Sequence, residues 1–167
     1  MKKFVLFLAL GLFIGTATFA QSKFGYIDSR ELLSAMPEVK KADTDVEAYA
    51  KSFEDQLQTM TKEYETKIKE YQAGEKTMSD AVKEVKQKEI MDLQNRIEAF
   101  NSSAQEKIAN KKSEIYKPLL DKADKAIKDV ATEKNYDYIF DAASGALLHA
   151  KDSDNILPLV KAKLGIK

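Results

Sequence analysis

The chain has 167 residues with 27 basic and 27 acidic side chains, so its formal net charge is zero. This balance leaves no global field that would attract nucleic acid or anionic lipid. The absence of cysteine excludes disulfides, thiol nucleophiles and cysteine-based metal sites. The length allows one ordinary domain, or one small body that carries an extension. Because 32% of the residues are charged and only six are glycine, the composition favours long solvent-exposed helices.

The first twenty residues have the pattern of a secretory signal peptide. Residues 1–3 are short and basic, residues 4–14 are almost uninterruptedly apolar, and small residues lead up to Ala20. This order is typical of an export signal, so we expect cleavage after Ala20 and a mature chain that begins at Gln21 with a net charge of about −2. A membrane anchor is the alternative, but the apolar run is shorter than the roughly 20 residues that a spanning helix needs.

The mature chain opens with a short apolar and aromatic run over residues 23–28, which predicts a strand. Asp28 and Ser29 then predict the cap of a short helical turn over residues 30–33. Pro37 follows, and its fixed φ suits the first turn of a new helix.

A long helical hairpin is predicted for the middle of the chain. From Val46 to Tyr71 apolar residues recur at steps of three or four on a charged background, which indicates a helix with one narrow apolar stripe. Gly74 is placed to end this helix, and Thr77 with Asp80 matches a capping box that begins the next. A stop and a start so close together predict an antiparallel reversal. The second helix is expected over residues 77–131.

Two further features complete the sequence pattern. Pro118 is expected to kink the second helix, because proline removes one internal hydrogen bond. After the helix the apolar period changes to two, and residues 136–141 and 145–151 predict the strands of a β-hairpin. A short helix closes the chain, with Asp154 or Asn155 as its cap and Gly165 at its end.

These elements predict an α+β protein in which a long antiparallel α-helical coiled-coil hairpin projects from a small β body. We expect residues 1–20 to form the signal peptide, residues 21–45 and 117–167 the β-rich oligomerisation body, and residues 46–116 the arm. A body this small is marginally able to bury its own core, so we expect it to self-associate. The residues predicted to build the oligomerisation body are Phe24, Tyr26, Ile27, Tyr138, Ile139, Phe140, Leu147 and Leu148.

Several such arms on one body would enclose a space with apolar side chains on its wall. A sparse apolar wall would bind exposed apolar segments weakly and without demanding a sequence, which is the behaviour of a holdase. The alternative is that the same side chains form only the seam between the two helices. The candidate client-binding residues are Tyr49, Phe53, Met60, Tyr64, Tyr71, Met78, Met91 and Phe100.

The opening strand at residues 23–28, the charged hairpin and the block at residues 126–141 resemble the Skp family of periplasmic chaperones, also called the OmpH family. The resemblance covers the whole mature chain and implies an ATP-independent homotrimer. In that family a barrel-like body of strands from three subunits carries three arms around a cavity for unfolded outer-membrane β-barrel proteins. Unlike the basic members of the family, this chain is near neutral, so contact with membrane lipid or lipopolysaccharide stays open.

The sequence predicts no catalytic activity, metal binding or nucleotide binding. His149 is the only histidine, and neither a catalytic triad nor a metal site can be completed around it. The many carboxylates on charged helices are typical of solvated faces and of pairs with lysine, and no nucleotide-binding or hydrolase motif is present. We therefore predict no catalytic residue, metal or cofactor. A structural coiled-coil spacer or adaptor, which binds a folded envelope partner at the hairpin tip near residues 74–77, is the second candidate function.

Overall fold

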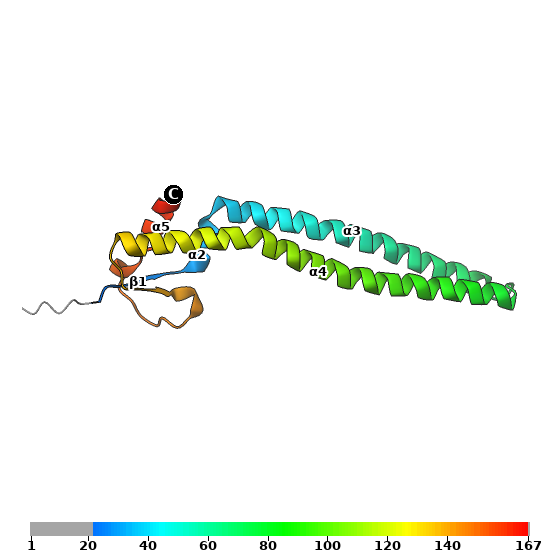
Figure 1. Ribbon diagram of the computed structural model, residues 1–167. Helices are drawn as coiled ribbons and strands as arrows, with labels where there is room; N and C mark the ends of the chain where they lie inside the picture. Colours follow the sequence, from blue (N-terminus) through cyan, green and yellow to red (C-terminus); the bar gives the residue numbers. More distant parts are fainter. Residues whose placement is uncertain (1–21, 167) are drawn as a thin grey trace, which may run out of the picture.

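The computed structural model describes residues 22–166, so the signal peptide expected at residues 1–20 lies outside the described residues. Figure 1 shows a small body at one end and two long helices that project from it side by side. The predicted fold class, a helical hairpin on a small strand body, is confirmed. In chain order the elements are β1 (Phe24–Ile27), α2 (Ser29–Ala35), α3 (Pro37–Gly74), α4 (Asp80–Glu133), β2 (Tyr138–Asp141), the 3₁₀ turns η1 (Ala142–Ser144) and η2 (Asp152–Asp154), and α5 (Leu157–Leu164).

The two long helices differ in length, as predicted. Helix α3 has 38 residues and α4 has 54, which correspond to lengths of about 57 and 81 Å. Helix α4 therefore runs past the start of α3 and enters the body. It contains Pro118, and Figure 1 shows it changing direction where its colour passes from yellow to green. The predicted kink is confirmed.

The reversal between the long helices is built differently from the predicted capping box. Helix α3 ends at Gly74 and is followed by Glu75 in right-handed conformation, with φ −50°. The N-cap of α4 is Ser79. Thr77 is not free to cap, because both its backbone N–H and its hydroxyl donate to the Gly74 carbonyl, at 2.9 and 3.0 Å. Helix α3 therefore ends at Gly74 as predicted, with Gly74 as its last helical residue and no left-handed turn there. The prediction of Thr77 as the N-cap is wrong.

Within residues 22–166, β1 and β2 form a sheet of two strands. Strands β1 and β2 are parallel, with Phe24 opposite Tyr138, and the Ile156 N–H donates to the Tyr26 carbonyl at 2.9 Å on the other edge of β1. Parallel neighbours need a long crossover, and the helical hairpin supplies it. The predicted β-hairpin is wrong, because residues 145–151 contain no strand.

The chain leaves the sheet after β2 for a local reason. The Asp141 carboxylate accepts from the Ala143 N–H at 2.9 Å, and the Ser144 hydroxyl donates to the Asp141 carbonyl at 2.8 Å. These bonds wind residues 142–144 into η1, which ends at Gly145 in left-handed conformation, with φ 74°. Because side chains of the turn satisfy the backbone here, the period-two pattern beyond it does not form a second strand on the same chain.

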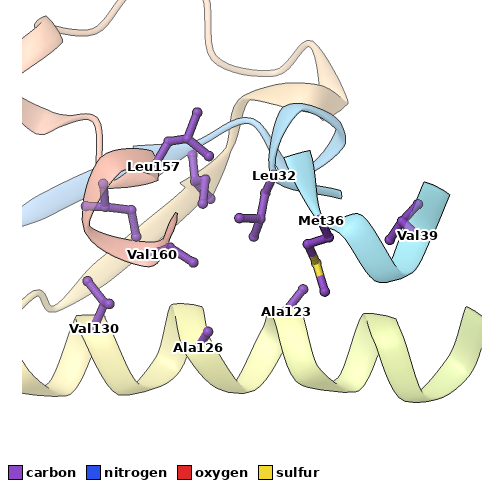
Figure 2. Packing of buried hydrophobic residues seen from close by; sticks show 10 residues of the cluster. Leu32, Met36, Val39, Ala123, Ala126, Val130, Leu157 and Val160 are labelled. Atoms are coloured by element: carbon purple, nitrogen blue, oxygen red, sulfur yellow. The ribbon is translucent and has the colours of Figure 1, made fainter. Parts of the chain in front are cut away.

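The hydrophobic core lies where α2 and α5 pack on the inner end of α4. Figure 2 shows their apolar side chains facing α4, whose small Ala123 and Ala126 permit close approach. Leu32, Met36, Ile156 and Val160 are fully buried, and partly buried apolar side chains such as Leu33 and Leu119 pack against them. The buried cluster consists of Ile27, Leu32, Met36, Val39, Ala123, Ala126, Val130, Ile156, Leu157 and Val160.

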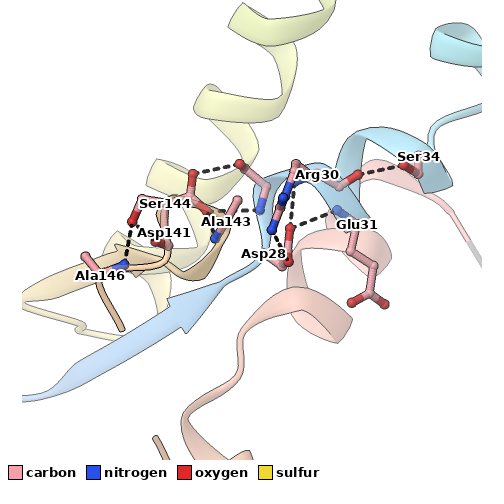
Figure 3. Close-up of polar contacts among 9 residues, drawn as sticks. Asp28, Arg30, Glu31, Ser34, Asp141, Ala143, Ser144 and Ala146 are labelled. Atoms are coloured by element: carbon pink, nitrogen blue, oxygen red, sulfur yellow. Dashed lines mark hydrogen bonds and ion pairs between the residues drawn. The ribbon is translucent and has the colours of Figure 1, made fainter. Parts of the chain in front are cut away.

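Two carboxylates fix the start of α2, as shown in Figure 3. Asp28 caps the helix as predicted, accepting from the Arg30 and Glu31 N–H groups at 2.9 and 3.1 Å. Asp141 accepts from the N–H and hydroxyl of Ser29 at 3.1 and 2.7 Å. The end of β2 is thereby tied to the first residue of α2.

Replacing Asp141 with alanine is expected to lower the free energy of unfolding by about 1 kcal/mol near neutral pH. Partial burial raises the pKa of Asp141, but the hydrogen bonds from Ser29 and Ala143 outweigh it and hold that pKa below its ordinary value. A carboxyl with a lowered folded pKa stabilises the protein above its unfolded pKa, and this contribution is lost as the pH falls through the folded pKa. Urea unfolding at about pH 7 and about pH 2 measures the difference, which should disappear in acid. Asp121→Ala, at an exposed position on α4, is the control and should change the free energy of unfolding at pH 7 by less than about 0.5 kcal/mol.

Candidate functional site

The arm is held together by a thin seam of partly buried aromatic and aliphatic side chains. Midway along it, Phe53 meets Phe100 of the opposite helix with ring centroids 5.9 Å apart. Tyr49 packs edge-on against Phe53 at 5.0 Å. Such pairs add to the stabilisation from burial. Within residues 46–116 only Leu93 and Ala104 are buried, so the contact between the helices is narrow.

Polar contacts continue the seam toward the tip. The Gln87 amide donates to the Tyr71 hydroxyl at 2.7 Å, and Lys67 pairs with Glu89 at 3.1 Å. This ion pair lowers the pKa of Glu89 and raises that of Lys67, but both groups are solvated, so its contribution to stability is small. At the reversal the Met78 side chain packs directly against Gly74, where a Cβ would collide with it.

The structure places the eight predicted client-binding residues in two groups. Tyr49, Phe53, Met60, Tyr64, Tyr71, Met78 and Phe100 are partly buried. Met91 alone is exposed, at 62%. Their assignment to client binding stays a prediction, and for the first seven the seam between the helices accounts for much of their apolar surface.

Two exposed apolar residues of the arm were not among the predicted candidates. Val82 is 44% and Val85 58% exposed, and both lie in the same distal part of α4 as Met91. Val82 and Val85 face solvent because other residues of the same helical turns face α3. Counting back one heptad from the buried Leu93 leads to Lys86, and both Lys83 and Lys86 are partly buried, so lysine and not valine occupies the seam positions here. The sequence contains this signal in the seven-residue spacing, which was missed because lysine is not an apolar residue.

A shallow hollow of about 480 Å³ lies beside Met91 at the distal end of the arm. Both helices line it, and most of its surface is apolar with amide and carboxylate groups among the apolar side chains. Its lining residues are Ile68, Tyr71, Gln72, Glu75, Gln87, Ile90 and Met91. The exposed apolar surface of the arm is thus concentrated near its tip.

The body exposes an aromatic face on its two-stranded sheet, which we define as Phe24, Tyr138 and Phe140. The Phe24 and Tyr138 rings stack at 5.5 Å, and the Phe24 and Phe140 rings lie 6.1 Å apart. All three side chains are exposed. The alternate residues of the strands face inward: Ile27 is in the core, and Ile139 packs against it. This inward group also belongs to the residues predicted for the oligomerisation body.

The remaining residues predicted for the oligomerisation body are Tyr26, Leu147 and Leu148. Tyr26 and Leu147 are partly buried, whereas Leu148 is 94% exposed.

Among residues 22–166 there is no cluster of three or more histidine or acidic side chains that could hold a metal ion. His149 is exposed. No helix in the described part of the chain is long and apolar enough to cross a membrane.

The protein has the architecture of a helical-arm protein. A long helical hairpin projects from a small strand body, and the body exposes an aromatic face. Within that class, the family described as "Outer membrane protein (OmpH-like)" matches residues 23–164. The chain belongs to this family, and the family predicted from the opening strand and the C-terminal block is confirmed.

Comparisons with individual proteins agree with the family assignment. The chain is 23% identical over 165 residues to Chaperone protein Skp of Pectobacterium atrosepticum, a match that covers 96% of this chain and all of the relative. It is 28% identical over 144 residues to a protein of Aquifex aeolicus, covering 86% of this chain and 85% of the relative. The crystal structure of an OmpH-like protein from Caulobacter crescentus CB15 has the same fold, with a TM-score of 0.75 at 15% identity over 92% of this chain and 89% of that one.

Proposed function

We propose that this protein is an exported, periplasmic holdase chaperone that works without ATP. In this proposal a homotrimer keeps unfolded outer-membrane proteins soluble in a cavity between its helical arms, and it catalyses no reaction. Membership of the OmpH-like family and the similarity to an Skp chaperone support a chaperone role. The observation that carries the proposal is the concentration of exposed apolar surface, Val82, Val85 and Met91, on an otherwise charged arm.

The chemistry of this surface suits a client that has no fixed shape. Three isolated aliphatic side chains offer weak contacts with exposed apolar segments, and no hydrogen-bond pattern that would select a sequence. Several arms acting on one client chain would add these weak contacts through effective concentration. The charged remainder of the arm would keep the complex soluble.

Self-assembly is the second requirement of the proposal, since one arm cannot enclose a space. Phe24, Tyr138 and Phe140 expose adjacent rings on a sheet of only two strands. Exposed apolar patches of this kind mark interaction sites, and homo-oligomers with closed symmetry are the common outcome. Cyclic assembly through this face would place the arms on the same side of the body.

A structural spacer or adaptor is the second candidate, and the hollow beside Met91 is the observation that favours it. Dilution of a urea-unfolded β-barrel protein into buffer separates the two functions. A holdase should suppress light scattering at roughly one oligomer per client, with or without ATP, whereas a spacer should leave aggregation unchanged.

Replacing Val82, Val85 and Met91 together with serine is expected to weaken client binding about tenfold or more. Each exposed apolar side chain contributes on the order of 1 kcal/mol when a client covers it, and tenfold in affinity corresponds to about 1.4 kcal/mol. Fluorescence titration with a labelled unfolded β-barrel protein measures the affinity.

The matched control for this variant replaces three exposed polar residues of the same helix with serine. Lys88, Asn95 and Asn101 are suitable positions. The control and the test variant should both retain the oligomeric mass of the original chain. Equal affinity of the two variants would show that the distal apolar residues do not bind clients.

A further inference from the structure

The hollow beside Met91 lies toward the end of the hairpin that is farthest from the body (Figure 1). Its volume of about 480 Å³ falls within the roughly 300–1,000 Å³ that small-ligand pockets occupy. Residues three or four apart share one face of a helix, and the α4 wall, Gln87, Ile90 and Met91, has this spacing. The opposite wall runs from Ile68 on α3 to Glu75 just after its end. The two helices together therefore form one concave site.

The apolar part of the lining suits an aromatic ring. Met91 is 62% exposed, and a methionine thioether makes favourable contacts with aromatic rings. Tyr71 contributes a partly buried ring, and aromatic rings pair with one another in offset-stacked or edge-on arrangements. Ile68 and Ile90, also partly buried, add aliphatic surface. A ring therefore gains specific contacts in this hollow that an aliphatic side chain does not.

The polar part of the lining is suited to accept hydrogen bonds. The Gln87 amide donates to the Tyr71 hydroxyl at 2.7 Å, which leaves the carbonyl oxygen of the same amide as an acceptor. Glu75 is an exposed member of the lining, and an ionised carboxylate only accepts hydrogen bonds. Tryptophan and tyrosine join an aromatic ring to an N–H or O–H donor. These two side chains therefore match both parts of the lining.

We infer that the hollow holds a tryptophan or tyrosine side chain of an unfolded client chain. This inference rests on the proposed function and deepens it, because it names a feature by which the arm selects among client segments. The small size of the surface argues against a folded partner as the occupant. Seven residues line the hollow, whereas a stable protein interface uses about 20–30 residues on each side. One ring from a flexible chain needs no larger surface.

Disulfide tethering tests the site on the whole mature chain, which has no cysteine of its own. Lys88→Cys places a thiol one helical turn from Met91, at an exposed position of α4 that does not line the hollow. Under mild reductant this thiol exchanges with two probes in equal amounts, the indole-3-acetyl amide and the isovaleryl amide of cystamine. Mass spectrometry measures the ratio of the two conjugates. The matched control is Asn95→Cys, an exposed position one heptad, or about 10 Å, farther from the tip.

The expected result is a preference for the aromatic probe at the hollow only. On the Lys88→Cys chain the indole conjugate should exceed the isovaleryl conjugate at least about fivefold, and on the Asn95→Cys chain by less than about twofold. Equal ratios on the two chains would overturn the inference, because the preference would then come from the probe alone. An excess of the isovaleryl conjugate would also overturn it. Circular dichroism identifies a chain that fails to fold, and Glu84→Cys, exposed and one turn from Gln87, then replaces Lys88→Cys.

A client chain tests the same selectivity in free solution. Met91→Gln keeps the length of the side chain and removes the thioether, so it should weaken the binding of a labelled unfolded β-barrel protein about threefold or more in a fluorescence titration. N-acetyl-tryptophan amide should compete with this client, and N-acetyl-leucine amide should not. The control Asp92→Gln, at the next position of α4, is exposed and outside the lining, and it should leave the affinity unchanged. Equal competition by the two amides would contradict an aromatic site.

Failure of this inference and failure of the proposed function give different results. Selective tethering on a chain that leaves a β-barrel client to aggregate would contradict the holdase, while the selectivity of the hollow for an aromatic ring would stand. A chain that suppresses aggregation without selective tethering would keep the holdase and remove the aromatic site.

Discussion

If the protein assembles and acts as proposed, replacing Phe140 with glutamate is expected to give monomers and to abolish the suppression of client aggregation. Phe140 is exposed on the aromatic face, 6.1 Å from the ring of Phe24. If a second subunit covers this face, an unpaired carboxylate there loses its hydration, a cost of several kcal/mol per ion. Association should therefore weaken by at least about a hundredfold. Light scattering of the mature chain measures the mass, and dilution of a urea-unfolded β-barrel protein measures the activity.

The conservative Phe140→Tyr variant is the control, because it keeps the ring and adds a hydroxyl with no charge. It should retain the oligomeric mass and the activity. Since Phe140 is not part of the buried core of its own chain, thermal melting of the glutamate variant should still show a cooperative transition. A Phe140→Glu variant that retains the mass of the original protein would contradict assembly through the aromatic face.

Replacing Leu32 with alanine is expected to lower the free energy of unfolding of the body by about 2–5 kcal/mol. Leu32 has no exposed surface and lies in the cluster that joins α2, α4 and α5. The truncation removes apolar contact and leaves a cavity, since the neighbouring helices can collapse only partly. In a domain whose total stability is typically about 5–15 kcal/mol, this is a large fraction. Urea unfolding followed by circular dichroism measures the change.

Leu159→Ala provides the matched control for the core substitution. It makes the same chemical change in α5, at a side chain that is 37% exposed and outside the buried cluster. We expect a loss below about 1 kcal/mol. Equal losses in the two variants would mean that the core does not lie where α2 and α5 meet α4.

Most elements could be predicted from the sequence because their determinants are local. Three determinants act within a few residues of the helix end that they fix. They are the Asp28 cap of α2, the proline at the start of α3, and Gly165, which ends α5 with φ 71°. The pairing of β1 with β2 could not be predicted in this way. It joins Phe24 to Tyr138, and nothing near either strand indicates its partner. Two period-two runs close together therefore favoured a hairpin that the chain does not form.

The candidate site also has one part that the sequence could predict and another that it could not. The apolar stripe correctly indicated the contact between the helices, but it could not separate seam residues from exposed ones. That distinction depends on the rotation of α4 about its axis, which places Lys83 and Lys86 toward the seam and leaves Val82 and Val85 in solvent. The apolar pocket of about 560 Å³ between α2, α4 and the two strands was not predictable, because its wall combines residues 27–33 with residues 120–141, which are far apart in the sequence.

The parallel pairing of β1 with β2 has a consequence for how the chain folds and diversifies. The bond from the Lys23 N–H to the Asp137 carboxylate connects residues 114 positions apart, so the sheet cannot form until the chain that carries the whole hairpin between its strands is complete. Formation of the body is then a late, topologically slow step. Conversely, equal insertions of whole heptads into both long helices would change the reach of the arm and leave the strand register untouched.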